Sequence, residues 1–331
     1  MVSRRGFLTT AAAVTAGGAL AACAKKPSTS GASGSTGGAK KQITLGFSQV
    51  GAESGWRTAN TKSIQDSAAA AGINLKFSDA QQKQENQIAA IRSFIQQKVD
   101  VISFSPVVVT GWDTVLNEAK AAKIPVILTD RAVQTSDASL YVTLVGSDFH
   151  AEGVRAGHMM EKVLTGMSGV KLAQLEGTTG SAPAIDRTKG FKEIMDTHSD
   201  WKLVVTQSGD FTRAGGKQVM QAFLQAHPDI NALFAQNDDM GLGAIQSIEA
   251  AGKKPGTDIK IVTIDGVHDG FVAMAAGKIN GIIECNPLLG PQLMETIKTV
   301  LAGGSVDKWI VTKESDFTQD MAAAALPTRK Y

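Results

Sequence analysis

The chain has 331 residues, with 33 Lys and Arg, 31 Asp and Glu, and two cysteines. Six of the basic residues and none of the acidic ones fall in residues 1–42, so the rest of the chain carries 27 basic and 31 acidic residues, a net charge of −4. This balance gives no support for nucleic-acid binding. If Cys23 is lipidated, Cys285 has no disulfide partner.

Residues 1–22 have the features of an export signal. Ser3-Arg4-Arg5-Gly6-Phe7-Leu8 has the form of a twin-arginine (Tat) signal, and an uncharged, Ala-rich stretch follows. Leu20-Ala21-Ala22-Cys23 resembles the bacterial lipobox, in which the cysteine is lipidated. We therefore predict an extracytoplasmic lipoprotein, anchored to the outer face of the cell membrane through Cys23. An ordinary signal peptide with an incidental cysteine, and export by the general pathway, remain the alternatives.

Residues 23–42 are predicted to be the lipidated cysteine followed by a flexible tether. The tether contains no large apolar residue and is rich in Ser, Gly, Ala, Thr and Lys. Such a composition cannot bury enough surface to fold.

Short apolar segments alternate with amphipathic ones along the rest of the chain. Strands are predicted at 43–49, 74–78, 101–104, 125–129, 142–145, 170–175, 202–207, 232–235, 259–264 and 279–283. Helices are predicted at 56–71, 82–97, 112–122, 151–164, 183–195, 213–226, 240–251 and 270–275. Repeated strand–helix units predict parallel sheets covered on both faces, and their number suggests two doubly wound α/β lobes.

Polar residues follow directly after several of the predicted strands. Gln49 ends the first strand and precedes a segment with a carboxylate, an aromatic ring and a guanidinium; the residues are Glu53, Ser54, Gly55, Trp56 and Arg57. Three further strands are followed by Asp130-Arg131, by Asn237 and by Asp265. The carboxyl ends of parallel strands face one crevice, where ligands bind. Carboxylates that accept from neighbouring hydroxyls, arginine forks and a stacking ring suit an uncharged, polyhydroxylated ligand such as a sugar.

Each of these signals also has a simpler explanation. Asp130-Arg131 alone could be a surface ion pair, Trp56 a core residue of its helix, and Arg187, early in a helix, an exposed arginine. The acidic pair after Asn237 could bind a cation, but it lacks the alternating spacing of a calcium loop.

Catalytic, cofactor and metal motifs are not found in the sequence. Phosphate-binding, dinucleotide-binding, serine-hydrolase and zinc-protease patterns are all missing, and the five histidines are scattered. We predict a binding protein with no enzymatic activity, cofactor or bound metal.

Several long segments of the sequence resemble a known family, the periplasmic sugar-binding proteins of the ribose/galactose class, which deliver sugars to ABC importers. The resemblance runs from about residue 43 to residue 313 and is most specific towards galactofuranose-binding members. It is carried by the segments 46–51, 53–57, 81–87, 184–187, 207–213 and 237–240.

The resemblance implies a type I periplasmic binding protein fold, in which two lobes joined by three hinge strands close on one sugar. Residues 43–146 and 285–312 would form the N-terminal lobe, and residues 147–284 and 313–331 the C-terminal lobe. Asp130 and Arg131 match the family's pair that grips sugar hydroxyls, and Phe211 matches its stacking aromatic. The polar ligands of the second lobe match Arg187, Asn237 and Asp265. Segment 54–57 stands where ribose binders carry Asn-Pro-Phe-Phe, so one aromatic is replaced by Arg57.

One segment departs from the family pattern. Glu284-Cys285-Asn286-Pro287 stands where ribose binders place a glutamine ligand, so Cys285 and Asn286 are not included among the predicted ligand-binding residues.

The function that follows is capture of a monosaccharide, galactofuranose or a related furanose or hexose. We expect a monomeric, membrane-anchored protein that delivers its sugar to the permease subunits of an ABC importer and their ATPase, without nucleic acid as a partner. A sugar-sensing module for a chemoreceptor or sensor kinase is the alternative. A transcription regulator is disfavoured because the N-terminal segment is a leader and tether in place of a DNA-binding domain.

Overall fold

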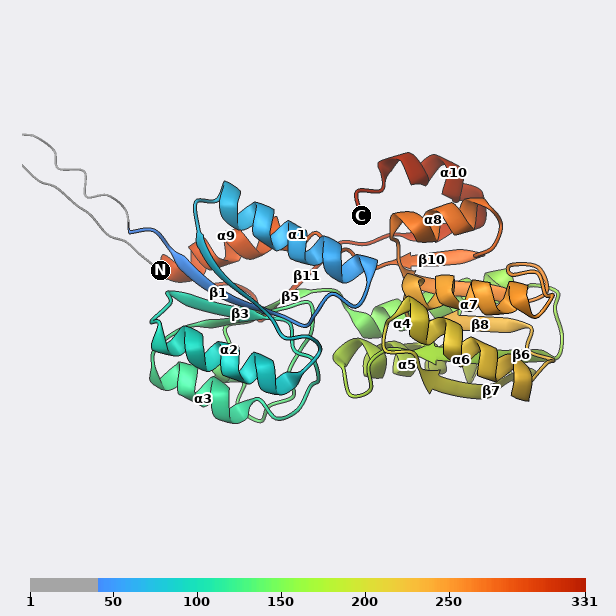
Figure 1. Ribbon diagram of the computed structural model, residues 1–331, viewed down its shortest axis with the longest axis horizontal. Coiled ribbons are helices and arrows are strands. Elements are labelled where there is room, and N and C mark those ends of the chain that lie inside the picture. Colours follow the sequence, from blue (N-terminus) through green and yellow to red (C-terminus); the bar gives the residue numbers. More distant parts are fainter. Residues whose placement is uncertain (1–40) are drawn as a thin grey trace, which may run out of the picture. The chain divides into compact units, whose positions relative to one another are not determined.

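The computed structural model describes residues 41–331. The predicted export signal, the lipobox cysteine Cys23 and nearly all of the tether lie outside these residues. In the described part, strands and helices alternate as expected and form two α/β lobes (Figure 1). No helix in this part is long and apolar enough to cross a membrane.

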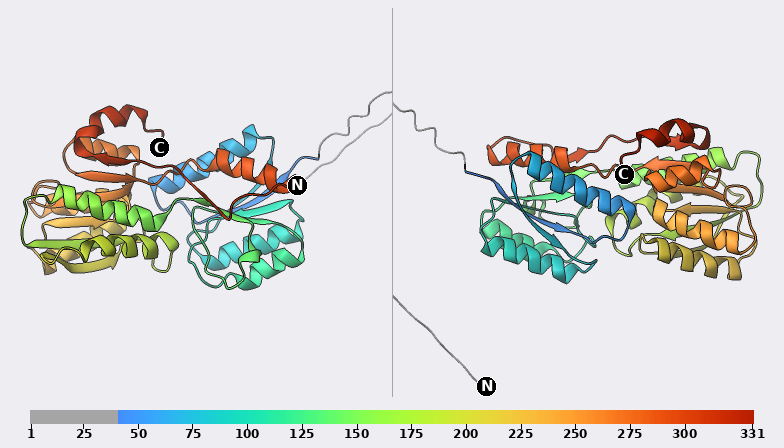
Figure 2. Two further views of the ribbon diagram at one scale, coloured as in Figure 1. Left: turned by 180° about the vertical axis from the view of Figure 1, so that it is seen from behind. Right: turned by 45° about the horizontal axis from the view of Figure 1, so that its top comes forward.

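The N-terminal lobe is built on a fully parallel sheet with the strand order β2-β1-β3-β4-β5-β11. Its strands are β1 (Thr44–Gln49), β2 (Asn74–Asp79), β3 (Val101–Phe104), β4 (Val126–Thr129), β5 (Thr143–Gly146) and β11 (Trp309–Val311). Its helices are α1 (Gly55–Ala70), α2 (Gln84–Gln96), α3 (Asp113–Ala121) and α9 (Gly290–Leu301), with the 3-10 turn η1 (Ala138–Leu140). Helices α1 and α9 pack together on one face, and α2 and α3 on the other (Figures 1 and 2).

The C-terminal lobe repeats this design with the strand order β7-β6-β8-β9-β10-β12, in which only the edge strand β12 runs antiparallel among the described strands. Its strands are β6 (Val170–Glu176), β7 (Trp201–Ser208), β8 (Ala232–Ala235), β9 (Lys260–Asp265), β10 (Gly281–Glu284) and β12 (Asp316–Thr318). Its helices are α4 (Phe149–Val163), α5 (Ala182–Met195), α6 (Arg213–Ala226), α7 (Asp238–Ala250), α8 (His268–Ala275) and α10 (Ala322–Ala325), with the 3-10 turns η2 (Gln319–Met321) and η3 (Leu326–Thr328).

Apolar side chains fill both faces of each sheet. Strands β3, β4, β8 and β10 are buried at every position, as the short continuous apolar runs predict. Separate hydrophobic clusters lie under α1 and α9, under α2 and α3, under α4 and α5, and under α6 to α8. Each lobe therefore has a core on either side of its sheet, which holds the carboxyl ends of the strands in fixed positions.

The chain passes between the two sheets in three crossovers. These are residues 147–148 between β5 and α4, residues 285–289 between β10 and α9, and residues 312–315 between β11 and β12. The connections lie side by side where the lobes meet (Figure 2).

Helices α9 and α10 and strands β11 and β12 were not among the predicted elements. Leu293, Met294 and Ile297 of α9 are buried against the N-terminal sheet, so a helical apolar stripe was present in the sequence. The two strands have three residues each, too few for an alternating pattern.

Candidate functional site

A narrow cavity lies between the two lobes at the carboxyl ends of the strands, with about 290 Å³ of empty space when the open solvent at its mouth is included. Ten of the eleven predicted ligand-binding residues line it: Glu53, Ser54, Trp56, Arg57, Asp130, Arg131, Arg187, Phe211, Asn237 and Asp265. The eleventh, Gly55, is not part of the lining, but its N–H donates to Asp239 Oδ2 at 2.7 Å. Phe149, Pro183 and Cys285 also line the cavity.

On the N-terminal lobe, Arg57 connects the carboxylates of Glu53 and Asp130. Its Nε donates to Glu53 Oε1 at 3.0 Å and its Nη2 to Asp130 Oδ2 at 2.7 Å. Nη1 donates to Gln49 Oε1 at 3.1 Å. Ser105 Oγ donates to the same Asp130 oxygen at 2.8 Å. Arg57 is thus mainly engaged by protein groups and fixes the direction of both carboxylates.

Arg131 has fewer partners than Arg57. Its Nη1 donates to the Val107 carbonyl at 3.3 Å, whereas Nε has no hydrogen-bond partner and lies 3.6 Å from Asp130 Oδ2. Burial and the neighbouring Arg57 lower the pKa of Arg131 to about 10. Burial also acts against the charge of Arg57, but the carboxylates of Asp130 and Glu53 outweigh it and raise the Arg57 pKa. Both guanidiniums remain charged at neutral pH.

On the C-terminal lobe, Arg187 is held by protein acceptors, as Arg57 is on the N-terminal lobe. Its Nε donates to Glu152 Oε2 at 2.7 Å and its Nη1 to the Gln236 carbonyl at 2.6 Å. Its Nη2 lies 3.9 Å from Asp265 Oδ1. Burial raises the pKa of Asp265 well above the ordinary range, with Arg187 opposing the shift. Arg187 is 3% exposed, so the surface-arginine alternative is wrong.

Aromatic rings accompany each of the three arginines. The guanidinium carbon lies 4.7 Å from the Trp56 ring centroid for Arg57, 5.4 Å from that of Phe211 for Arg131, and 5.1 Å from that of Phe149 for Arg187. This alternation of charged forks and ring faces offers a ligand both hydrogen-bond donors and apolar surface.

The backbone is strained at three of the lining residues. Asp130, Phe211 and Asp265 have φ angles of 62°, 59° and 132°, a region that L residues rarely adopt. Such strain is concentrated at functional sites because surrounding packing must hold it. Gly146 permits one of these turns, since a Cβ there would lie 2.8 Å from the Asp130 carbonyl oxygen.

Helix starts position two further lining residues. Ser54 caps α1 by accepting from Arg57 N at 3.1 Å, and Asn237 caps α7 by accepting from Met240 N at 2.9 Å. The Asn237 amide also donates to the Phe211 carbonyl at 3.0 Å, which ties the α7 start to the backbone that carries the aromatic ring.

The two lobes contact each other beside the cavity. Asp239 of α7 accepts from Gly55 N of α1, and Val109 N donates to the Gly180 carbonyl at 2.9 Å. Trp56, from the N-terminal lobe, packs into the hydrophobic cluster under α4 and α5 and donates from Nε1 to the Cys285 carbonyl at 2.6 Å.

The acidic pair after Asn237 does not form a joint cation site. Asp238 accepts from Thr263 Oγ1 and from the N–H groups of Gly266 and Val267, whereas Asp239 binds Gly55 and Arg213. Burial raises the pKa of Asp238 to about 7. The two carboxylates therefore serve separate structural contacts.

Comparison with known proteins agrees with this architecture. Residues 45–305 match the model of the periplasmic binding protein domain. The chain belongs to the periplasmic binding protein family. The galactofuranose-binding protein YtfQ of Escherichia coli is 45% identical over 292 residues, which cover 87% of this chain and 92% of that protein.

Two solved structures are also similar over most of their length. A crystal structure from Mycobacterium smegmatis in complex with β-D-fucofuranose is 61% identical, with a TM-score of 0.85, and the match covers 87% of this chain and 95% of that one. The binding protein of an arabinose ABC transporter from Shewanella sp. ANA-3, bound to α- and β-L-arabinofuranose, is 47% identical, with a TM-score of 0.84 and coverage of 87% and 96%.

Sequence reasoning missed three lining residues and one supporting residue. Phe149 and Pro183 lie in the first turn of a helix, as does Trp56, and a search for aromatic and proline residues after each strand would have found them. Cys285 was set aside as a departure from the family pattern. Glu152 lies within α4, where no local pattern indicates contact with Arg187.

Proposed function

We propose that this chain is a lipid-anchored solute-binding protein that captures a monosaccharide in its furanose form and delivers it to an ABC importer. The proposal is supported by relatives whose names state galactofuranose, fucofuranose and arabinofuranose as ligands. All three ligands have a five-membered sugar ring, so a furanose ring is better supported as the ligand class than any individual sugar. A periplasmic binding protein acts outside the cytoplasm, in keeping with the predicted leader and Cys23 anchor.

The assignment to sugars rests on one observation: some buried polar atoms around the cavity have protein hydrogen-bond partners and others have none. Arg57 is nearly saturated by protein acceptors, but Glu53 Oε2 and Arg131 Nε are buried without a hydrogen-bond partner. A buried polar atom without a partner costs about 1–3 kcal/mol. Sugar hydroxyls both donate and accept, so one ligand can satisfy a carboxylate and a guanidinium together.

The mechanism we propose is closure about the three crossovers. The N-terminal lobe (43–146 and 285–312) and the C-terminal lobe (147–284 and 313–331) would move as units. A sugar held between Asp130 and Arg131 on one lobe and Arg187 and Asp265 on the other binds the closed state more tightly than the open one. It therefore shifts the population towards closure, and the closed surface is what the importer would recognise.

The sensing alternative rests on the same fold and ligand chemistry. The curated relatives include ribose and fructose import binding proteins, at 32% and 35% identity. The fructose-binding domain of a two-component system is 22% identical, so its likeness concerns the fold alone. Import is therefore the better-supported role.

The proposal is tested by calorimetric titration of the full chain with L-arabinose, D-fucose, D-galactose and D-ribose. We expect tight binding of at least one of the first three and weak binding of ribose. Because the ring forms of a free sugar interconvert in water, the bound form is read separately from the carbon NMR spectrum of the complex with labelled sugar, which should show the furanose ring. A bound pyranose would refute the furanose assignment, and no heat with any sugar would refute the ligand class.

A further inference from the structure

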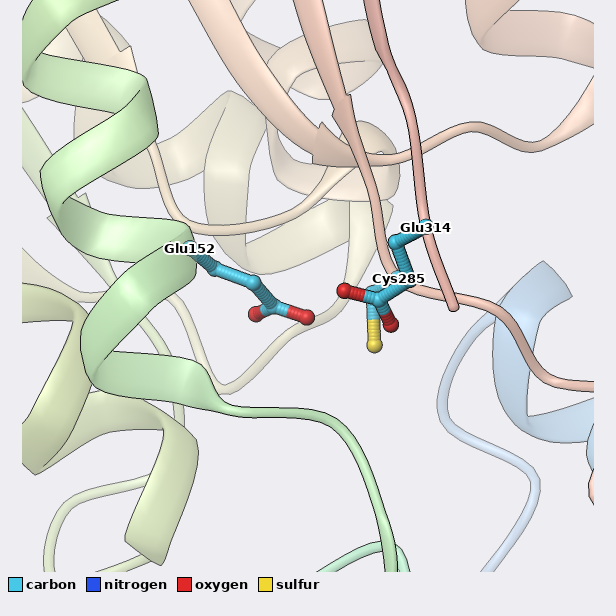
Figure 3. A group of neighbouring side chains, drawn as sticks. All are labelled: Glu152, Cys285 and Glu314. Carbon is cyan, nitrogen blue, oxygen red and sulfur yellow. The ribbon is translucent and has the colours of Figure 1, made fainter. Parts of the chain in front are cut away.

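A cluster of buried acidic and thiol side chains lies at the crossovers, behind the cavity. It consists of Glu152 on α4, Cys285 on the second crossover and Glu314 on the third, and we call it the hinge cluster. One ligand atom from each residue lies within 4.8 Å of the others, the only such group of three within residues 41–331. Figure 3 shows the Glu152 carboxylate directed from its helix towards Cys285 and Glu314.

Glu152 contributes a buried oxygen that has no partner. Its side chain is fully buried, and Oε2 accepts from Arg187 Nε at 2.7 Å. Oε1 has no hydrogen-bond partner. Nearly all buried polar atoms in proteins are paired, so Oε1, beside the Cys285 thiol and a second carboxyl, offers an acceptor position that the thiol proton or a cation can fill.

The other two donors are held in place but retain the capacity to bind. Glu314 accepts from Ser147 Oγ and from Asn286 N at its Oε1, and from Arg155 Nη2 at 2.9 Å at its Oε2. A carboxylate offers about four acceptor sites, so one stays available. The sulfur of Cys285 lies 3.5 Å from Ser147 Oγ, and the residue is 1% exposed.

We propose that the hinge cluster is a binding site for a thiophilic divalent cation of the zinc type, held by Cys285 Sγ, Glu152 Oε1 and one oxygen of Glu314. Thiolate and carboxylate oxygen are both zinc ligands, and a thiolate disfavours magnesium and calcium. Arg187 and Arg155 hold the carboxylates from outside, as second-layer partners of metal ligands do. Three protein donors leave a further coordination position for water.

Burial disfavours the ionised forms of all three side chains in the cluster. Burial, with Glu152 as neighbour, raises the pKa of Cys285 well above its usual range, and burial raises the pKa of Glu314 to about 8. Cation binding would form bonds to sulfur and two oxygens and release to solvent the protons that these atoms carry.

The site would couple cation binding to the geometry of the hinge. Its ligands come from two crossovers and from the first helix of the C-terminal lobe, so a bound ion fixes these segments relative to one another. Because Cys285 also borders the cavity, the ion and the sugar would influence each other's affinity by the same factor.

The experiment uses the full chain with Cys23→Ser, so that Cys285 is its one cysteine. Co²⁺ is titrated at neutral pH, and the thiolate-to-cobalt charge-transfer band is followed in the near ultraviolet; Zn²⁺ is then added to displace it. We expect one equivalent of Co²⁺ to produce the band and one equivalent of Zn²⁺ to abolish it.

Variants locate the ion. Cys285→Ser should abolish the band, and Glu152→Gln should weaken Zn²⁺ binding at least tenfold. Asp316→Asn removes a carboxylate that binds the same Arg155 (Oδ1 to Nη1, 2.9 Å) but lies outside the cluster, and should bind as the parent does. Absence of the band in a folded parent, or equal Zn²⁺ affinity in Cys285→Ser, would overturn the proposal. Neither readout depends on sugar binding, so it can fail independently of the proposed function.

Discussion

Replacement of Asp130 by Asn removes one of two carboxylates from a buried group of four charges. Glu53 and Asp130 face Arg57 and Arg131, and the side chains of all four are at most 5% exposed. The Asn side chain keeps the shape but not the charge, so the group acquires a net positive charge. It also replaces the charged acceptor of Arg57 Nη2 (2.7 Å) and of Ser105 Oγ by a neutral amide oxygen, which accepts more weakly.

The magnitude follows from the two roles of this carboxylate. Breaking a buried ion pair by removal of one partner costs about 3–5 kcal/mol of folding free energy. The loss of a carboxylate that accepts from the ligand costs about 1–3 kcal/mol in binding, roughly a 5- to 150-fold weaker affinity. We therefore expect Asp130→Asn to lower both the free energy of unfolding and the sugar affinity.

Chemical denaturation and calorimetric titration separate the two effects. Ser105→Ala is the matched control, because it removes one neutral donor to the same oxygen and leaves the charges intact. We expect it to cost about 1 kcal/mol in stability and to bind sugar nearly as the parent does. If Asp130→Asn bound the cognate sugar within twofold of the parent, Asp130 would not face the ligand and the site would be misplaced.

Four further predictions concern other parts of the site. Gly177→Ala places a Cβ 1.8 Å from the Phe211 ring, so the ring must move and sugar affinity measured by titration should fall at least tenfold, with the fold retained by circular dichroism. Trp56→Phe keeps a ring but loses the bond to the Cys285 carbonyl, so its affinity should lie between those of the parent and Trp56→Ala; equal affinities for Phe and Ala would exclude a stacking role. Asp239→Asn weakens the acceptor of the Gly55 N–H, so small-angle X-ray scattering of the sugar-free protein should show a larger radius than for the parent, and an unchanged radius would exclude a role in closure. Burial raises the pKa of Asp238 to about 7, so the folded protein binds this proton more tightly than the unfolded chain does. The thermal unfolding midpoint should therefore fall as pH rises from about 4 to 7. Asp238→Asn should make the midpoint less dependent on pH, which melting curves at pH 5 and 8 would check.

The alternation of strands and helices could be predicted because it depends on local patterns. Strands β3 and β8 are short apolar runs buried on both faces, and their predicted bounds match those in the structure. Helix starts are also local, since Ser54, Asn237 and Thr212 each cap the helix that follows. The edge strands β11 and β12 depend on contacts made after folding and carry no comparable signal.

The sequence also predicted which residues meet at the site, because their positions follow from local strand patterns. It did not predict which protein groups pair with them. Asp130 and Asp265 each follow a strand, so the fold alone brings them to one crevice. The pairing of Arg187 with Glu152 joins two helices that are adjacent in space, and the pattern of either helix gives no sign of it. The engagement of Arg57 by protein acceptors was likewise not visible, because it depends on distances among three strand ends.

The direct contacts between the lobes, compared with the contacts available to a ligand, indicate what drives closure. Apart from contacts at the crossovers, two hydrogen bonds between described residues join the lobes, from Gly55 N to Asp239 and from Val109 N to the Gly180 carbonyl. At about 0.5–1.5 kcal/mol each, they supply roughly 1–3 kcal/mol. A shift from mostly open to mostly closed needs about 5.5 kcal/mol of differential binding. These bonds favour closure with or without a ligand, so the ligand-dependent shift must come from a sugar that contacts both lobes in the closed state. Arg131 Nε and Glu53 Oε2 are buried polar atoms available to it on the N-terminal lobe. Closure should therefore depend on a sugar that reaches the N-terminal and C-terminal sets of side chains at once, and a shorter polyol that satisfies one set should bind without closing the cleft.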